Sequence, residues 1–105
     1  MRMWLINPEI LCTNHLLGEH NELHMLVGAI QKGKSIQGFK DLVQTKEINS
    51  RHEQLVNELI RRHFIHNSPL EYKDELNFGT VDKETSLIEL LARCPKCYYR
   101  YVYGE

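Results

Sequence analysis

The sequence has little of several features that mark common protein classes. No window approaches the roughly 20 apolar residues of a membrane-spanning helix, and Asn7, Pro8 and Glu9 interrupt the apolar start before a signal-peptide core can form. Three cysteines are too few, and an odd number, for a disulfide scaffold. Internal repeats, low-complexity tracts and strong strand patterns are also missing. We therefore expect a soluble, cytoplasmic, single-domain protein over residues 1–105.

An excess of positive charge is missing as well. Thirteen Lys and Arg residues stand against fourteen Asp and Glu residues, which gives a formal net charge of −1. Proteins that bind nucleic acid usually carry a basic surface, so the overall composition argues against a DNA enzyme but leaves room for a local patch. The cations that could form such a patch are Arg2, Lys32, Lys34, Lys40, Arg51, Arg61, Arg62, Arg93, Lys96 and Arg100.

The first stretch with helical periodicity covers residues 13–33, with Thr13 or Asn14 as a cap. A helix here places His15, Glu19 and Glu22 within roughly 60° of arc, beside an apolar stripe. Two carboxylates next to a buried face have two explanations. They are either a solvated row that favours the helix dipole or part of a site, and the spacing alone leaves both open.

Two further helices are predicted from the spacing of apolar residues. One covers residues 48–64, and the other runs from Asp82 to Arg93 and is ended by Pro95. The fold class predicted is therefore all-α, a compact single domain of three main helices followed by an aromatic C-terminal tail. The stretches between the helices are predicted as connecting chain, at residues 33–46 with one short helical turn and at residues 66–80.

Four stretches resemble, in the same order, one known enzyme family. They are MRMWLI at the start, HLLGEHNELHMLVGAIQKG, RHEQLVNELIRRHF and the closing CPKCYYRYVYG. Together they are similar to the bacteriophage-type pyrimidine-dimer DNA glycosylase/abasic-site lyase family, also called phage endonuclease V. The resemblance implies an all-α fold whose N-terminal segment is threaded toward the helices. The apolar residues 3–6 are the reason to expect that segment to be pinned.

The chemistry that the resemblance implies centres on an N-terminal amine. In the family this amine attacks C1′ of the damaged nucleotide, displaces the base and leaves a Schiff base that eliminates the 3′ phosphate. An α-amino group is a weaker base than a lysine side chain, so more of it is unprotonated at neutral pH. Here the amine belongs to Met1, which the bulky Arg2 predicts to be retained, whereas the family exposes a small residue before its arginine. Glu22 matches the catalytic glutamate that transfers protons.

The resemblance also implies residues that contact DNA. His15 and Glu19 match family positions and are expected to orient Glu22 or to contact the opened strand, although His15 could instead be a helix-start residue bonded to local backbone. Asn21 and Met25 depart from the family, because its best-known members carry arginines there that grip the duplex. The substrate-binding candidates are therefore Arg2, His15, Glu19, Tyr98, Tyr99, Arg100 and Tyr101.

The C-terminal tail alternates tyrosines with basic residues, which suits stacking on exposed bases and contact with phosphates. The structural alternative is a packed arm whose tyrosines cover the helices. The partner expected is duplex DNA with a damaged or modified base or an abasic site. We expect a monomer that needs no metal and no organic cofactor for this chemistry.

One pattern of residues favours a metal site and a different function. Cys94 and Cys97 have zinc-ligand spacing, and His20 and His24 lie four residues apart on a helix, so a Cys2His2 site is conceivable. A single CxxC is weak evidence, and an exposed or half-buried pair of thiols is the alternative. His52 lies in the apolar stripe of the second helix and is expected in the core. The competing function is a non-catalytic module that binds nucleic acid or protein on the same scaffold, stabilised by zinc if the metal is present.

Overall fold

The computed structural model describes residues 1–65 and 68–104, so residues 66 and 67 of the predicted connection and residue 105 lie outside it. Within this part of the chain the regular structure is entirely helical, and the predicted all-α class is confirmed. None of these helices is both long and apolar enough to cross a membrane. The helices are α1 (Thr13–Gln31), α2 (Ile48–Arg61), α3 (Lys83–Arg93) and α4 (Pro95–Tyr103), with 3-10 turns η1 (Pro8–Ile10), η2 (Gln37–Phe39) and η3 (Thr45–Glu47).

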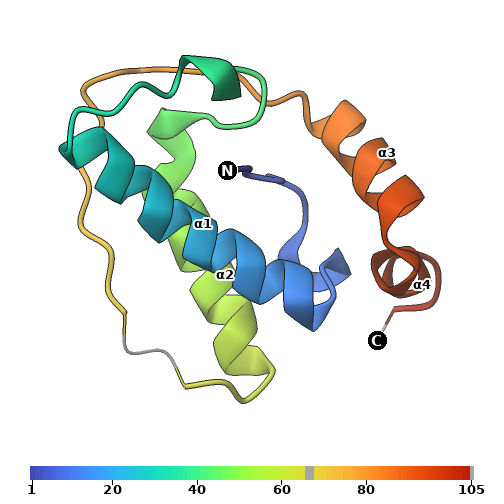
Figure 1. Cartoon of the computed structure of the whole chain (residues 1–105). Coiled ribbons are helices and arrows are strands. Elements are labelled where there is room, and N and C mark those ends of the chain that lie inside the picture. The colour runs from blue at the N-terminus through green and yellow to red at the C-terminus, as the bar shows by residue number, and fades with distance from the viewer. Residues whose placement is uncertain (66–67, 105) are drawn as a thin grey trace.

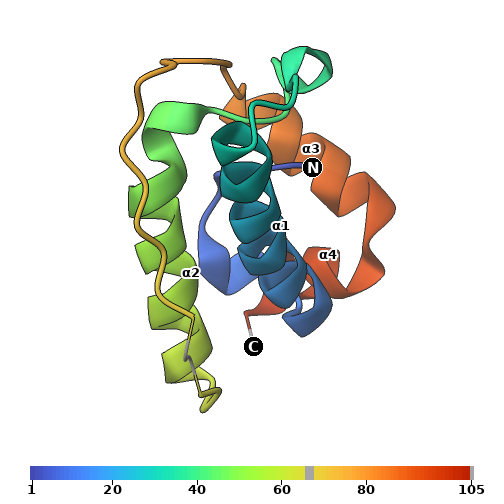
Figure 2. The same ribbon diagram turned by 60° about the vertical axis from the view of Figure 1, so that its left-hand side comes forward.

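Helices α1 and α2 pack against each other, and α3 and α4 lie on the other side of the N-terminal segment (Figures 1 and 2). The apolar residues that recur at helical spacing point into the region between these helices and the N-terminal segment, where their apolar area is buried. The core therefore joins all parts of the domain. Its fully buried aliphatic residues include Leu11, Leu16, Leu23, Leu26, Val43, Ile48, Leu55 and Leu90.

The predicted aromatic tail is a helix, α4. Cys94 ends α3 and caps α4, and its Sγ accepts a hydrogen bond from the backbone N–H of Cys97. Pro95 occupies the first turn of α4, where a missing N–H costs nothing. The sequence reasoning treated Pro95 only as a stop for α3, although the same residue also starts the next helix. A second correction concerns α1, whose N-cap is Cys12 rather than Thr13 or Asn14.

The N-terminal segment, residues 1–6, runs between α1 and α3 (Figure 1). Its backbone is bonded to three separate parts of the chain: Met3 N–H donates to the carbonyl of Leu42 (2.8 Å), Ser86 Oγ donates to the carbonyl of Trp4 (2.7 Å), and Arg51 donates to the carbonyl of Ile6 (2.6 Å). Residues 3–6 are buried. Hydrogen bonds and apolar burial therefore both hold this segment in place.

The long connection between α2 and α3 runs along α2 before it crosses to α3 (Figure 2). It is fixed by Thr45 N–H, which donates to the carbonyl of Phe78 (2.9 Å), and by Thr80 N–H, which donates to that of Lys40 (2.9 Å). Gly79 adopts φ +84°, and a Cβ there would lie 2.1 Å from the carbonyl oxygen of Val43. This close crossing therefore requires glycine.

Candidate functional site

Glu22 lies on α1 and faces the first residues of the chain. Its Oε2 accepts a hydrogen bond from the backbone N–H of Arg2 at 3.2 Å. The guanidinium of Arg2 lies over the ring of Trp4, 3.9 Å from its centroid, and forms an ion pair with Glu89 of α3 (Nη2 to Oε2, 2.6 Å). The Arg2 side chain is therefore fixed from both sides, and Met1 is joined to a backbone that touches the Glu22 carboxylate.

A cleft of about 250 Å³ opens beside this contact. It brings together four of the residues predicted for the site, namely Arg2, His15, Glu19 and Glu22. The sequence pattern does not indicate Trp4 or Asn14 as site residues, and it marks Arg93 only as one of several cations available for a basic patch. No local motif points to these three, because they enter the cleft through the packing of distant segments. The full lining is Arg2, Trp4, Asn14, His15, Gly18, Glu19, Glu22 and Arg93.

Glu19 forms the buried side of the cleft. It is 1% exposed, and its two carboxylate oxygens accept hydrogen bonds from Nε (2.6 Å) and Nη2 (2.9 Å) of Arg51. Arg51 is equally buried, so its inclusion among candidate phosphate contacts is wrong. The row of carboxylates on α1 is thus not a solvated row throughout, since Glu19 is paired in the interior and only Glu22 is partly accessible. A bidentate pair of this kind holds both side chains in one geometry.

The ring of His15 is held by sulfur and by an aromatic face. Its Nδ1 lies 3.2 Å from Sγ of Cys12 and 3.5 Å from Sγ of Cys97, and its ring meets Trp4 edge-on with centroids 5.8 Å apart. These contacts differ from the alternative of a helix-start residue bonded to local backbone. Of the two ring nitrogens, only Nε2 remains for a role in the cleft.

The conceivable Cys2His2 site does not form. Cys94 and Cys97 meet Cys12 and His15, whereas His20 and His24 meet His52 in a separate cluster. The reason is that the first turn of α1 faces the α3–α4 junction, while the next turns of α1 face α2. The three rings of the second cluster lie 4.8–5.2 Å apart between centroids, and His52 is 4% exposed, in the core as expected.

The tyrosines of α4 point outward. Tyr98, Tyr99 and Tyr101 are 52%, 58% and 50% exposed, so about half of each side chain is accessible to a ligand and half is covered by the protein. A hollow of about 390 Å³ lies between α4 and the start of α1. Asn14 lines both this hollow and the cleft, so the two adjoin. The hollow is lined by Cys12, Thr13, Asn14, Lys96, Tyr99 and Arg100.

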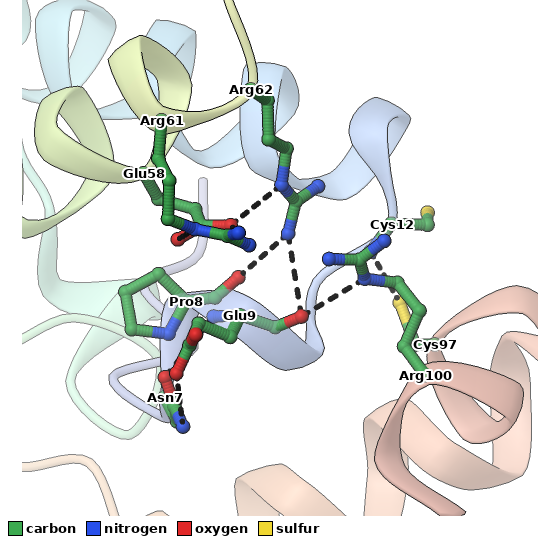
Figure 3. A network of polar contacts seen from close by, with 9 residues as sticks. All are labelled: Asn7, Pro8, Glu9, Cys12, Glu58, Arg61, Arg62, Cys97 and Arg100. Carbon is green, nitrogen blue, oxygen red and sulfur yellow. Dashed lines mark hydrogen bonds and ion pairs between the residues drawn. The ribbon is translucent and has the colours of Figure 1, made fainter. Parts of the chain in front are cut away.

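Two cations expected at the surface instead hold η1 in place (Figure 3). Arg100 Nε donates to the carbonyl of Glu9 at 2.9 Å, and Arg62 Nη2 donates to the carbonyls of Pro8 and Glu9 at 3.2 and 3.3 Å. Arg62 also bonds Glu58 through Nε at 2.7 Å. These hydrogen bonds join the end of α2 and the middle of α4 through one short turn.

Asn21 and Met25, the two departures from the resemblance, are exposed on α1 close to Glu22. Met25 is one turn from Glu22 along the same side of the helix and is 60% exposed. An apolar side chain and an amide therefore stand on this surface where arginines would add positive charge beside the cleft.

Comparison with known proteins gives one finding. The family model described as pyrimidine dimer DNA glycosylase matches residues 1–72, which include the N-terminal segment, α1 and α2. Neither a curated protein nor a solved structure matches the chain. The matched residues hold Arg2, Glu22 and most of the cleft, while α3 and α4 lie beyond the match. The chain therefore belongs to the pyrimidine dimer DNA glycosylase family, a family of DNA repair glycosylases.

Proposed function

We propose that this protein is a DNA glycosylase with abasic-site lyase activity, in which the α-amino group of Met1 is the nucleophile and Glu22 transfers protons. One observation carries the proposal. The hydrogen bond of 3.2 Å from Arg2 N–H to Glu22 Oε2 keeps the residue that follows the amine in contact with the carboxylate. Because Met1 is bonded to Arg2, its amine lies one residue from this contact, and nucleophilic catalysis requires the amine and the proton-transfer group to be close.

The chemistry needs two stages. In the first, the lone pair of the amine attacks C1′ while the C1′–N bond breaks, and the proton lost from the amine passes through Glu22 to the departing base. In the second, the C1′–O4′ bond breaks as O4′ takes up a proton through Glu22, which leaves a protonated imine. Glu22, now a carboxylate, removes a proton from C2′, and the C3′–O bond breaks with the 3′ phosphate as the leaving group. A carboxylate beside the cationic imine also stabilises the charge that develops there.

The surroundings of the cleft support contact with a flipped nucleotide. Trp4, held beneath the Arg2 guanidinium, is one of the residues that line the cleft. The exposed ring of Tyr99 lines the adjoining hollow, and that of Tyr98 is exposed on the same helix; both could stack on bases left unpaired by the flip. Lys96 and Arg100 both line the same hollow. Lys96 would contact phosphates, whereas Arg100 Nε is bonded to the carbonyl of Glu9.

Borohydride trapping tests the proposal. The full-length protein, its N-terminal residue verified by intact mass, is incubated with duplexes that contain one abasic site, a pyrimidine dimer or no damage. Reduction converts the imine into a stable covalent adduct. We expect an adduct with the first two duplexes and none with the third, together with cleavage of the damaged strand.

The decisive variant is Glu22→Gln. Glutamine still accepts the Arg2 N–H but cannot take up a proton, so adduct formation should fall by about 100-fold or more, whereas Glu53→Gln, at an exposed site on α2, should match the wild type. Chemical blocking of the N-terminal amine should abolish the adduct. A folded protein with a free terminus that forms no adduct on any duplex would leave the non-catalytic binding module as the function of this scaffold.

A further inference from the structure

All three cysteines of the chain and one histidine meet at a single point. Cys12 and His15 come from the start of α1, and Cys94 and Cys97 come from the junction of α3 and α4. Their ligand atoms lie within 4.8 Å of one another. Cys12 and Cys97 are buried, at 6% and 0% exposure, and Cys94 is 9% exposed. The mechanism proposed above uses none of the sulfur atoms.

Three of the distances between ligand atoms are close to those of a tetrahedral metal site. Zn–S bonds of about 2.3 Å and Zn–N bonds of about 2.0–2.1 Å place neighbouring ligand atoms about 3.5–3.8 Å apart. Here Cys12 Sγ lies 3.8 Å from Cys94 Sγ, and His15 Nδ1 lies 3.5 Å from Cys97 Sγ and 3.2 Å from Cys12 Sγ. A disulfide would need a sulfur separation of about 2.05 Å, and three thiols cannot all be paired.

The local backbone supports thiolate ligands. The N–H of Cys12 donates to Cys97 Sγ at 3.2 Å, and the N–H of Cys97 donates to Cys94 Sγ at 3.4 Å (Figure 3 shows the former). Such bonds stabilise negative charge on sulfur. In sequence the four residues form C-x2-H and C-x2-C pairs, the spacing that lets two ligands from one turn reach the same ion.

We propose that Cys12, His15, Cys94 and Cys97 bind one Zn²⁺ in a closed structural site. Soft thiolates with one imidazole in a tetrahedral arrangement favour zinc over the harder divalent cations. Four protein ligands leave no open position, so the ion has a structural role. Binding replaces the protons of the three thiols, which are released to solvent, and leaves a complex of net charge −1. Lys96, between two of the ligands in sequence, supplies a nearby cation.

The site would fasten α3 and α4 to α1. The two ligand pairs are separated by about 80 residues of chain, so a bound ion closes a very long loop. Helix α3 also carries Glu89, which pairs with Arg2, and Ser86, which bonds the carbonyl of Trp4. Zinc would therefore hold in place the α3 side of the cleft, which lies beyond the family match, without touching the reacting atoms.

The test begins with the wild-type protein, purified at neutral pH with a reductant and without added chelator. Elemental analysis should give about one zinc per chain, and a thiol reagent should find no reactive cysteine until a strong chelator is added, after which three react. Because every cysteine belongs to this cluster, the thiol count reports on the site alone. Co²⁺ in place of zinc should give tetrahedral ligand-field bands and an intense thiolate charge-transfer band.

Two pairs of variants locate the metal. Cys94→Ser and His15→Ala should weaken zinc binding by more than about 100-fold. His24→Ala, in the neighbouring histidine cluster, and His63→Ala, exposed beyond α2, should retain the metal. Should Cys94→Ser fail to fold, the wild-type thiol count and cobalt spectrum still decide the matter.

Several outcomes would overturn the proposal. They are a folded wild type that is free of metal with three reactive thiols, a mass lower by two hydrogens that shows a disulfide, an octahedral cobalt spectrum, or loss of zinc in His24→Ala with retention in His15→Ala. None of these results depends on enzymatic activity, so the zinc site and the proposed lyase chemistry stand or fall separately.

Discussion

Replacing Glu19 with glutamine tests how strongly the buried pair supports the site. The change removes the negative charge opposite the Arg51 guanidinium and one of the two acceptors, at 2.6 and 2.9 Å. Both residues are 1% exposed, so water cannot compensate the remaining charge. Breaking such a pair costs about 3–5 kcal/mol. Because glutamine retains one oxygen acceptor, we expect the lower value, about 3 kcal/mol in free energy of unfolding, or a fall in Tm of about 12–24 °C.

Urea unfolding followed by circular dichroism at pH 7 and fixed zinc concentration measures this loss. Glu53→Gln, exposed on α2, is the matched control and should change the free energy by less than about 0.5 kcal/mol. The double variant Glu19→Leu with Arg51→Met should recover part of the loss, because no charge is then left unpaired. Recovery should be incomplete, since the carbonyl of Ile6 loses its donor.

The reasoning would be refuted if Glu19→Gln stayed within about 1 kcal/mol of the wild type, as a surface salt bridge would. The same result would show that the buried side of the cleft does not depend on the pair of Glu19 and Arg51. Trapping assays separate the effect of the change on folding from its effect on the cleft. A variant that is destabilised yet folded at low temperature should bind damaged duplex but form little covalent adduct with it.

Three further predictions follow from other features. Asn21→Arg with Met25→Arg should tighten binding to duplex DNA and steepen its dependence on log salt concentration by about two units if both side chains reach phosphates, measured by fluorescence anisotropy. Gly79→Ala should lower the free energy of unfolding by at least about 1–3 kcal/mol, because the added methyl group meets a backbone carbonyl in a left-handed conformation. The pKa of Glu58 is lowered, and the largest cause is the hydrogen bond from Arg61. The ionised Glu58 therefore stabilises the fold fully above about pH 4.3, the ordinary glutamate pKa, and this stabilisation is lost as the pH falls through the lowered value. The stability difference between wild type and Glu58→Gln should therefore shrink on acidification.

Each of these has a matched control. Asn57→Arg on the exposed side of α2 adds charge away from the cleft and should leave the salt slope closer to that of the wild type. Gly28→Ala has open space around the added methyl group inside a helix and should stabilise by up to about 1 kcal/mol. Glu53→Gln should show no comparable change with pH. Equal effects in a variant and its control would contradict the corresponding prediction.

The helices could be predicted from the sequence because their apolar residues recur with a fixed period, and local pattern suffices for that. The partners of particular polar residues could not. Glu19 and Glu22 look alike in the row on α1, yet only the first meets an arginine that lies 32 residues further along the chain. Pro95 shows the limit at short range, since a residue that ends one helix can also begin the next.

The cysteines illustrate the same limit at long range. The C-x2-C pair is visible in the sequence, and so is Cys12 three residues before His15. No local sequence feature indicates that these two pairs lie together. On spacing alone, the histidines at positions 20 and 24 are equally good candidates for ligands beside Cys94 and Cys97. Packing of the α3–α4 junction against the first turn of α1 decides between them.

The hydrogen bonds of the N-terminal segment also bear on biosynthesis. Residues 1–6 leave the ribosome before the partners that hold them, among which are Glu22, Leu42, Arg51, Ser86 and Glu89. Their full set of native contacts cannot form until α3 has emerged, so the cleft cannot be complete before α3 is made. Until then this part of the chain stays accessible to processing enzymes. A nascent chain stalled after residue 72 would hold every residue of the family match and still lack α3, which supplies Arg93 to the cleft.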